Sequence, residues 1–214
     1  MKIVSSNPCD EIERPRANPS PPRGLTAEEV RRLLAVIPET PEGLRDRAIV
    51  LTLVLTGRRR SEILNLRAGD LSTDGGLSYA YRGKGGKQAK RELPRPAFDA
   101  IETALAAWEK NLPTMDAGES IWPSRHAAAN GMGLTSGTFY ARFRRYMQAA
   151  GLAPAGVHIL RHAAAKLRRD AGESVEEVSQ FLDHSSLQVT SVYLRRLEGQ
   201  EDRGWDKVAE ALGV

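Results

Sequence analysis

The sequence has 214 residues and a formal net charge of +4, with 31 Lys and Arg against 27 Asp and Glu, and its pI lies near 9.4. This length can bury one good hydrophobic core, and the basic balance favours a polyanionic partner such as nucleic acid, although a solvated surface can carry the same charge. The single cysteine, Cys9, excludes an internal disulfide and fits a reducing cytoplasm. The start of the sequence does not resemble a signal peptide. The longest apolar run, residues 48–55, is shorter than the about 20 residues that span a bilayer, so no membrane partner is expected.

The first 24 residues differ in composition from the rest. They have no apolar periodicity and contain five of the twelve prolines: Pro8, Pro15, Pro19, Pro21 and Pro22. Such a segment is typical of a linker or tail. The run Thr26-Ala27-Glu28-Glu29 then has the pattern of a capping box. The folded unit is therefore expected to cover residues 25–214.

Helices are expected after this capping box. Apolar side chains line one face of residues 30–37, and a second, more buried helix is expected over residues 43–55. Gly57 should end or bend that helix, because glycine readily adopts the left-handed backbone of a helix end. A short helix over residues 61–66 should follow.

The centre of the chain predicts a β-hairpin. Residues 77–93 alternate imperfectly around the turn-forming run GKGGK. Further helices are expected over residues 97–110, 135–150, 160–171, 175–182, 189–194 and 205–212. The sequence therefore predicts a mainly α-helical fold with a small antiparallel β-sheet or hairpin.

Two arginines stand where helices begin or break. Arg59 follows the expected break at Gly57, and Arg161 opens another helix. Cleavage of a phosphodiester without a metal requires cations for the non-bridging oxygens, and the planar guanidinium suits this better than an ammonium. Taken singly, each is more simply explained as a surface arginine.

Such a reaction also needs a nucleophile and groups that transfer protons. Tyr193 offers a phenol, which must lose a proton despite a reference pKa of about 10. His158, His184 and Lys84 could accept or donate protons. Each also has a plainer interpretation: His158 as a neighbour of a helix N-cap, His184 as a cation at a helix C-terminus, and Lys84 as a solvated lysine at a turn.

The order of these groups resembles that of the tyrosine site-specific recombinases, the phage integrase family. The run TGRRRSEI, residues 56–63, is similar to the family's first motif, T-G-x-R-x-S/G-E, and assigns its catalytic arginine to Arg59. The run Gly83-Lys84-Gly85 resembles the hairpin that carries the family's catalytic lysine. Lys84 is the assignment, with Lys87 and Lys90 as alternatives.

The later motifs extend this resemblance. The run HILRH matches the family's H-x-L-R-H motif, which assigns catalytic roles to His158 and Arg161 and leaves His162 a structural one. The run LDHSS resembles the third motif, L-G-H-S-S, and assigns His184 as the second histidine. Tyr193 then matches the nucleophile.

One residue departs from the third motif, because Asp183 replaces the usual glycine. Aspartate tolerates the left-handed backbone better than most residues, so the turn is expected to survive. Its carboxylate could raise the pKa of the neighbouring His184.

The resemblance implies site-specific DNA recombination by cleavage and rejoining. Tyr193 would attack the scissile phosphate and form a covalent 3′-phosphotyrosyl link. Arg59 and Arg161 would hold the non-bridging oxygens with support from His184, and Lys84 would protonate the leaving 5′-oxygen.

The remaining roles complete this mechanism without a cofactor. His158 would serve as acid and base for the tyrosine, and Glu62 would support Arg59 or a histidine from behind. The sequence has no phosphate-binding loop of the form G-x-x-x-x-G-K-S/T. His158 and His162 lie four residues apart, but the segment lacks the glutamate of H-E-x-x-H, so no metal is expected.

The implied partners are double-stranded DNA and further recombinase subunits in a DNA-bound assembly, most simply a tetramer. Basic residues outside the motifs could grip backbone phosphates or form a solvated face. These are Arg142, Arg144, Arg145, Arg168 and Arg169. A C-terminal helix near Trp205 could dock on a neighbouring subunit or on its own domain.

Family members usually carry a separate N-terminal DNA-binding domain, which has no counterpart in the about 24 residues before Leu25. Weak DNA binding, and cleavage without efficient recombination, are therefore expected. Two alternatives stay open: a type IB topoisomerase-like enzyme that nicks and closes DNA, and a non-catalytic DNA-binding module.

Overall fold

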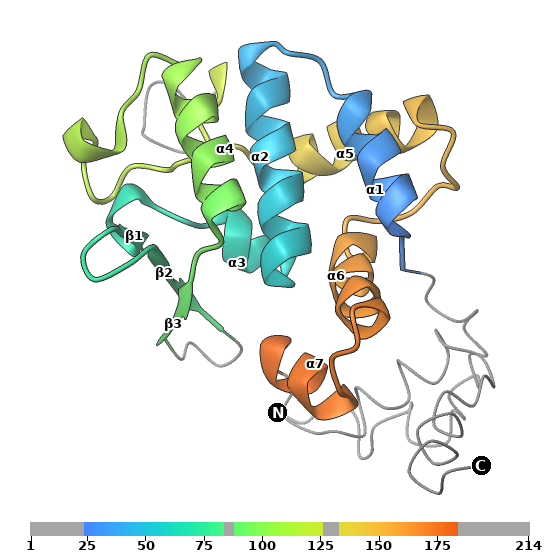
Figure 1. Cartoon of the computed structure of the whole chain (residues 1–214). Coiled ribbons are helices and arrows are strands. Elements are labelled where there is room, and N and C mark those ends of the chain that lie inside the picture. Colours follow the sequence, from blue (N-terminus) through green and yellow to red (C-terminus); the bar gives the residue numbers. More distant parts are fainter. Residues whose placement is uncertain (1–23, 84–87, 126–132, 184–214) are drawn as a thin grey trace, which may run out of the picture.

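The computed structural model describes residues 24–83, 88–125 and 133–183, which form a mainly helical unit with one small antiparallel sheet (Figure 1). This confirms the expected fold class. The predictions for residues 1–23, 189–194 and 205–212 lie outside the described residues. The α-helices are α1 (Ala27–Ala35), α2 (Pro41–Thr56), α3 (Arg60–Leu64), α4 (Arg95–Ala106), α5 (Ser136–Ala149), α6 (Ile159–Asp170) and α7 (Val175–Phe181). The 3-10 helices are η1 (Ala68–Asp70) and η3 (Leu112–Thr114), and the strands are β1 (Leu71–Ser72), β2 (Ser78–Arg82) and β3 (Gln88–Glu92).

The predicted capping box opens α1. The backbone N–H of Glu29 donates to the Thr26 hydroxyl at 3.2 Å, and the backbone N–H of Thr26 donates to the Glu29 carboxylate at 2.9 Å. The N–H groups of Thr26 and Glu29 at the helix start are therefore satisfied. The helix buries Val30 and Leu33 in the core.

Helix α2 is the centre of the molecule and packs against α4 and α6 (Figure 1). It begins at Pro41 behind the Thr40 cap, and it ends at Gly57, whose φ of 62° confirms the predicted helix end. The apolar side chains that it buries almost completely are Ala48, Ile49, Val50 and Leu53. Because α2 is buried on several sides, its second half, residues 48–55, is apolar almost throughout rather than along one stripe.

The predicted hairpin is present as β2 and β3, with Tyr79 opposite Arg91 and Tyr81 opposite Ala89. Tyr79 and Tyr81 face the core, whereas most of β3 is exposed. Strand β1 adds a third, antiparallel member that the sequence analysis did not predict. It has only two residues, which is too short for a period-2 pattern to appear.

Helix α4 ends at Ala106, four residues before its predicted end. Lys110 donates its backbone N–H to the carbonyl of Leu105, and Glu109 adopts a φ of 56°, which turns the chain away from the helix axis. The turn is formed by ordinary residues without Gly or Pro. A sequence pattern therefore gives little warning of it.

A buried ionic network joins α2 to α5. One carboxylate oxygen of Asp46, whose residue is fully buried, accepts from Arg45 Nη2 at 2.8 Å. Its other oxygen accepts from the Tyr146 hydroxyl at 2.8 Å and from Arg142. Arg45 also donates to the carbonyl of Pro123 at 2.6 Å. Burying these charges together satisfies each of them.

Helix α7 packs differently from the other helices. It contacts α6 through a small apolar cluster of Ala165, Val178 and Leu182, separate from the main core. Figure 1 shows it at the edge of the molecule, below α6. None of the helices in the described parts of the chain has the length and apolarity to cross a membrane.

Candidate active site

The turn between α2 and α3 sends two adjacent arginines in different directions. Arg58 is 2% exposed, whereas the Arg59 side chain is 37% exposed. The left-handed Gly57 makes this sharp turn possible, because its φ of 62° is unfavourable for a residue with a Cβ. Arg59 therefore has access to solvent and Arg58 does not.

Glu62 holds Arg59 in place. One carboxylate oxygen accepts from the Arg59 backbone N–H and the other from its Nη1, both at 2.8 Å. The Glu62 side chain is only 3% exposed, so these charge-assisted bonds are shielded from water. Arg59 is thus pre-oriented by a buried carboxylate.

Arg161 lies in the first turn of α6 and is 4% exposed. Its Nη1 donates to the carbonyl of Gly57 and its Nη2 to the carbonyl of Leu182, both at 2.6 Å. Burial, with the charges of Arg59 and Arg58, lowers the pKa of Arg161 to about 10. The guanidinium therefore remains a cation at neutral pH and joins the ends of α2 and α7.

His158 caps the start of α6, and its ring meets that of His162 edge-on with the centroids 4.7 Å apart. Partial loss of water around the imidazole, followed by the charges of Arg161, Arg59 and Arg60, lowers the pKa of His158 below 6.5. These interactions also show that His158 shares one region with the two arginines. A neutral imidazole there can accept a proton near pH 7.

The structure thus brings together Arg59, Glu62, His158 and Arg161. Lys84, His184 and Tyr193 lie outside the described residues, as does the predicted effect of Asp183 on the pKa of His184. The alternative lysine Lys90 lies on β3 and is exposed.

A charged network around Asp183 was not predicted from the sequence. The Asp183 carboxylate forms an ion pair with buried Arg58, accepts from the hydroxyl of Tyr81, and accepts from Arg91 Nη2 at 2.8 Å. The Arg58 guanidinium lies 5.2 Å from the Tyr81 ring centroid and 5.8 Å from that of Phe181. The replacement of the motif's glycine by Asp183, together with a charge at Arg58, was the available signal.

Asp183 has a φ of 51°, so the left-handed turn expected at this position is present. Partial burial works to raise the pKa of Asp183. Hydrogen bonds from Tyr81 and Arg91, with the charges of Arg58 and Arg91, outweigh it and hold the pKa below 3.8. Asp183 is therefore an anion throughout the neutral range.

The basic residues outside the motifs fall into two groups. Arg142 binds Asp46 and Tyr146, Arg168 binds Glu173 at 2.6 Å and stacks 3.6 Å from the Phe181 ring centroid, and Arg169 donates to the carbonyl of Glu173. These three arginines are engaged in the fold. Arg144 and Arg145 are exposed on α5.

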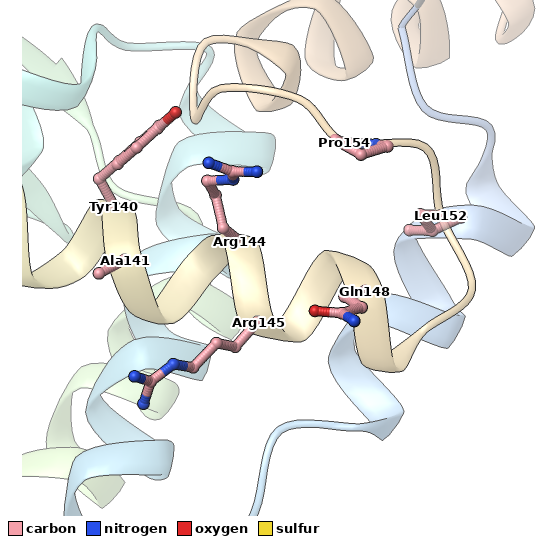
Figure 2. Close-up of a pocket in the computed structure, with 7 residues that line it drawn as sticks. All are labelled: Tyr140, Ala141, Arg144, Arg145, Gln148, Leu152 and Pro154. Carbon is pink, nitrogen blue, oxygen red and sulfur yellow. The ribbon is translucent and has the colours of Figure 1, made fainter.

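Arg144 and Arg145 border an open hollow of about 700 Å³. Figure 2 shows Tyr140 and Arg144 on one side of α5, facing the chain near Pro154, and Arg145 on the other side. Tyr140 is the large hydrophobic residue that is exposed in this region, at 38%. Exposed arginines, one of them on the same side of the helix as an exposed aromatic ring, can contact an anionic backbone.

Within residues 24–83, 88–125 and 133–183, no three His, Cys, Asp or Glu side chains are grouped so that they could hold a metal ion.

Curated relatives of the chain are tyrosine recombinases. Tyrosine recombinase XerC 2 of Ralstonia nicotianae is 33% identical over 198 residues, covering 87% of this chain and 53% of that protein. Tyrosine recombinase XerA of Thermococcus kodakarensis is 34% identical over 189 residues, covering 87% of this chain and 64% of that protein. The chain therefore spans between about half and two thirds of the length of these relatives.

Solved structures share the fold. The XerH site-specific recombinase bound to a palindromic difH substrate in a post-cleavage complex has a TM-score of 0.67 and 24% identity, covering 90% of this chain and 53% of XerH. The catalytic domain of bacteriophage HP1 integrase has a TM-score of 0.59 and 18% identity, covering 88% of this chain and 94% of that domain. The phage integrase family is matched over residues 23–199, most of the sequence, and the chain belongs to this family.

Proposed function

We propose that this chain is the catalytic part of a site-specific tyrosine recombinase that cuts and rejoins double-stranded DNA through a covalent 3′-phosphotyrosyl intermediate. The observation that carries the proposal is the grouping of Arg59, backed by buried Glu62, with Arg161 and a His158 whose pKa is lowered. Two cations beside a neutral imidazole suit a phosphodiester whose transition state gathers charge on the non-bridging oxygens.

In the cleavage step, the Tyr193 oxygen forms a bond to phosphorus and the bond from phosphorus to the 5′-oxygen breaks. His158 accepts the phenol proton, and Lys84 donates a proton to the leaving 5′-oxygen. Arg59 and Arg161 hold the non-bridging oxygens, with support from His184. These roles follow the motif assignments, and Lys84, His184 and Tyr193 enter as proposals.

Rejoining reverses this step. A 5′-hydroxyl gives its proton to Lys84 and its oxygen forms a bond to phosphorus. The bond from phosphorus to the Tyr193 oxygen breaks, and His158 returns the proton to the tyrosine. Because the phosphotyrosyl bond conserves the energy of the broken one, the reaction consumes no ATP. The relatives support this direction, since XerC 2 and XerA are named tyrosine recombinases and XerH was solved with its difH substrate after cleavage.

We assign the backbone grip outside the motifs to Arg144 and Arg145, because Arg142, Arg168 and Arg169 are engaged with Asp46, Tyr146 and Glu173. Replacing Arg145 by Gln should reduce the slope of log affinity against log salt concentration by about 1, because one phosphate contact is lost. Arg31→Gln, at an exposed position of α1, is the matched control and should leave the slope unchanged. Equal slopes for wild type and Arg145→Gln would remove Arg145 from the interface.

The proposal extends to organisation and partners. Residues 1–24 serve as a linker or tail and residues 25–214 as the catalytic domain, which works with other subunits in a DNA-bound tetramer. The single Cys9 fits a reducing cytoplasm.

The test uses a pool of short nicked duplexes that contain a randomised segment. After cleavage, the short strand next to the nick diffuses away with its 5′-hydroxyl. Rejoining is then blocked, and the covalent adduct accumulates. Wild-type protein should retain covalent DNA on denaturing gels, and peptide mapping should place the link on Tyr193. Tyr193→Phe should form no adduct while its thermal unfolding is unchanged. An adduct that survives this change, or none with wild type, contradicts the proposal.

Sequencing the captured DNA separates the remaining alternatives. A recombinase enriches particular sequences, whereas a type IB topoisomerase-like enzyme captures the pool almost indifferently and relaxes supercoiled plasmid. A non-catalytic binding module forms no adduct with any duplex.

A further inference from the structure

We propose that Asp183 is a positioning residue that acts through Arg58 to hold Arg59 and Arg161 in the geometry required for strand cleavage. The inference rests on the proposed function. Asp183 stands where the family's third motif has glycine. The proposed positioning therefore depends on an ion pair, Arg58 with Asp183, that a glycine at this position could not form.

Arg58 depends on Asp183 for its counter-charge. The Arg58 side chain is 2% exposed, and within the described parts of the chain its other polar contacts are neutral: the Tyr81 hydroxyl at 2.6 Å and the carbonyl of Thr56 at 3.1 Å. A buried guanidinium is strongly unfavourable without a paired anion. The Asp183 carboxylate therefore fixes where the Arg58 side chain can lie.

Two sets of polar interactions connect residues 57–58, after α2, with residues 182–183, after α7. Arg161 connects the carbonyls of Gly57 and Leu182, and the ion pair of Arg58 with Asp183 connects the next residue on each side. A shift of this pair therefore moves the backbone that leads into Arg59 and the carbonyl that holds Arg161.

The hairpin supplies a third support. The hydroxyl of Tyr81 on β2 donates to the carboxylate oxygen that Arg58 also contacts, and Arg91 on β3 binds the other oxygen at 2.8 Å. Tyr81 is buried, whereas the Arg91 side chain is half exposed and contributes less. Asp183 is thus held from strands β2 and β3 and from the turn between α2 and α3, which restricts its movement.

The test compares Asp183→Asn, which keeps the shape and removes the charge, with Arg58→Met and with the double variant. The readouts are the first-order rate of adduct formation at saturating nicked duplex recovered from the pool, and the DNA concentration that gives half of that rate. Each single variant should slow the saturated rate by about tenfold to a hundredfold, the scale of a misplaced catalytic group, with little change in the half-saturating concentration.

The double variant should be no slower than the slower single variant, because both changes remove the same ion pair between Arg58 and Asp183. Losses that multiply would show that Asp183 acts without Arg58, and unchanged saturated rates would show that it does not position the site. Asp99→Asn, in the exposed Arg95–Asp99 pair, is the matched control and should cleave at the wild-type rate.

Asp183→Asn leaves a buried cation and could fail to fold, which its thermal unfolding reports. In that event Arg58→Met decides. A slow saturated rate for Arg58→Met, which adding Asp183→Asn does not lower further, supports the proposal. A wild-type rate for Arg58→Met overturns it. A wild-type protein that forms no adduct overturns the proposed function and this inference together. Normal wild-type cleavage with unaffected variants overturns the inference alone.

Discussion

Arg58 and Arg59 are neighbours in the chain with opposite environments. Arg58 is buried with Asp183 as its counter-ion, and Arg59 reaches solvent with Glu62 behind it. The same residue type therefore serves the fold at one position and the candidate site at the next. The cause is the left-handed turn at Gly57, which separates the two side chains.

His158 makes the candidate site sensitive to acid. Its pKa lies below 6.5, so the proton-accepting neutral form predominates at pH 7 and is lost as the pH falls through the lowered pKa. The saturated cleavage rate should therefore rise with pH through a midpoint below 6.5 and level off near neutrality. His158→Gln should be slow and lack this rise. A wild-type midpoint above 6.5 would contradict the assignment.

The lowered pKa also predicts the direction in which stability changes with pH. The unfolded chain binds the proton of His158 more readily than the folded chain does, so acid favours unfolding. Stability from this group is complete above about 6.5 and decreases as the pH falls towards the folded-state pKa. Urea unfolding of wild type and His158→Gln between neutral and acid pH measures the difference.

Asp46 is a buried anion that accepts hydrogen bonds from Arg45, Arg142 and Tyr146. Replacing it by Ala leaves Arg45, which is 2% exposed, without its paired charge. The free energy of unfolding should fall by about 3–5 kcal/mol, the usual cost of breaking a buried pair. Glu28→Gln, in an exposed pair with Arg31, should lower it by less than about 1 kcal/mol. Equal losses in urea titrations would show that the buried network is not stabilising.

At the scale of elements, α2 and α7 meet at a position that only glycine fits. A Cβ at Gly57 would lie 2.4 Å from Cε1 of Phe181 and 2.9 Å from Cδ2 of Leu182. Gly57 therefore serves both the helix end and the approach of α7.

Gly57→Ala should combine two penalties. The left-handed backbone costs about 1–2 kcal/mol for a residue with a Cβ, and the overlap with α7 adds about 1–3 kcal/mol. Gly75→Ala separates the two penalties. Gly75 has a φ of 70°, and no atom of the described residues lies within 4 Å of the position where a Cβ would stand. Gly75→Ala should lose the backbone part alone, and similar losses for the two variants in thermal unfolding would exclude the overlap.

The helix that carries Arg142, Arg144 and Arg145 shows why a basic stripe is ambiguous in sequence. Arg142 turns inwards to Asp46, whereas Arg144 and Arg145 are exposed beside the hollow in Figure 2. Helical periodicity predicts which positions share a face. Periodicity does not predict that the Asp46 carboxylate of α2 lies opposite Arg142.

At the scale of the whole molecule, apolar burial is uneven. Helix α2 lies in the main core, and α7 is attached by a small apolar cluster and by polar ties. Segments with few buried apolar contacts open more readily than the core.

Native-state hydrogen exchange should therefore show faster exchange for the amides of α7 than for those of α2. The protection of α2 should approach the global free energy of unfolding, and α5, which also contributes to the main core, provides the comparison. Equal protection of α7 and α2 would show that the polar ties make the two helices one cooperative unit.

Much of the fold could be predicted because local signals and packing agree. The capping box at Thr26, the helix end at Gly57 and the antiparallel pairing of β2 with β3 each have a short-range cause, and all are present. The end of α4 and the strand β1 could not be predicted, since one depends on an unmarked turn at Glu109 and the other on pairing across the sheet.

The sequence by itself determined the family, the order of the elements and the identity of Arg59, His158 and Arg161 as candidates, because motif spacing and periodicity are properties of the chain. The tertiary structure alone decided that Arg58 is buried against Asp183 and that Arg161 joins the carbonyls of Gly57 and Leu182. These residues are up to 125 positions apart, and the burial that makes an ion pair necessary arises only when α2, the hairpin, α6 and α7 pack together.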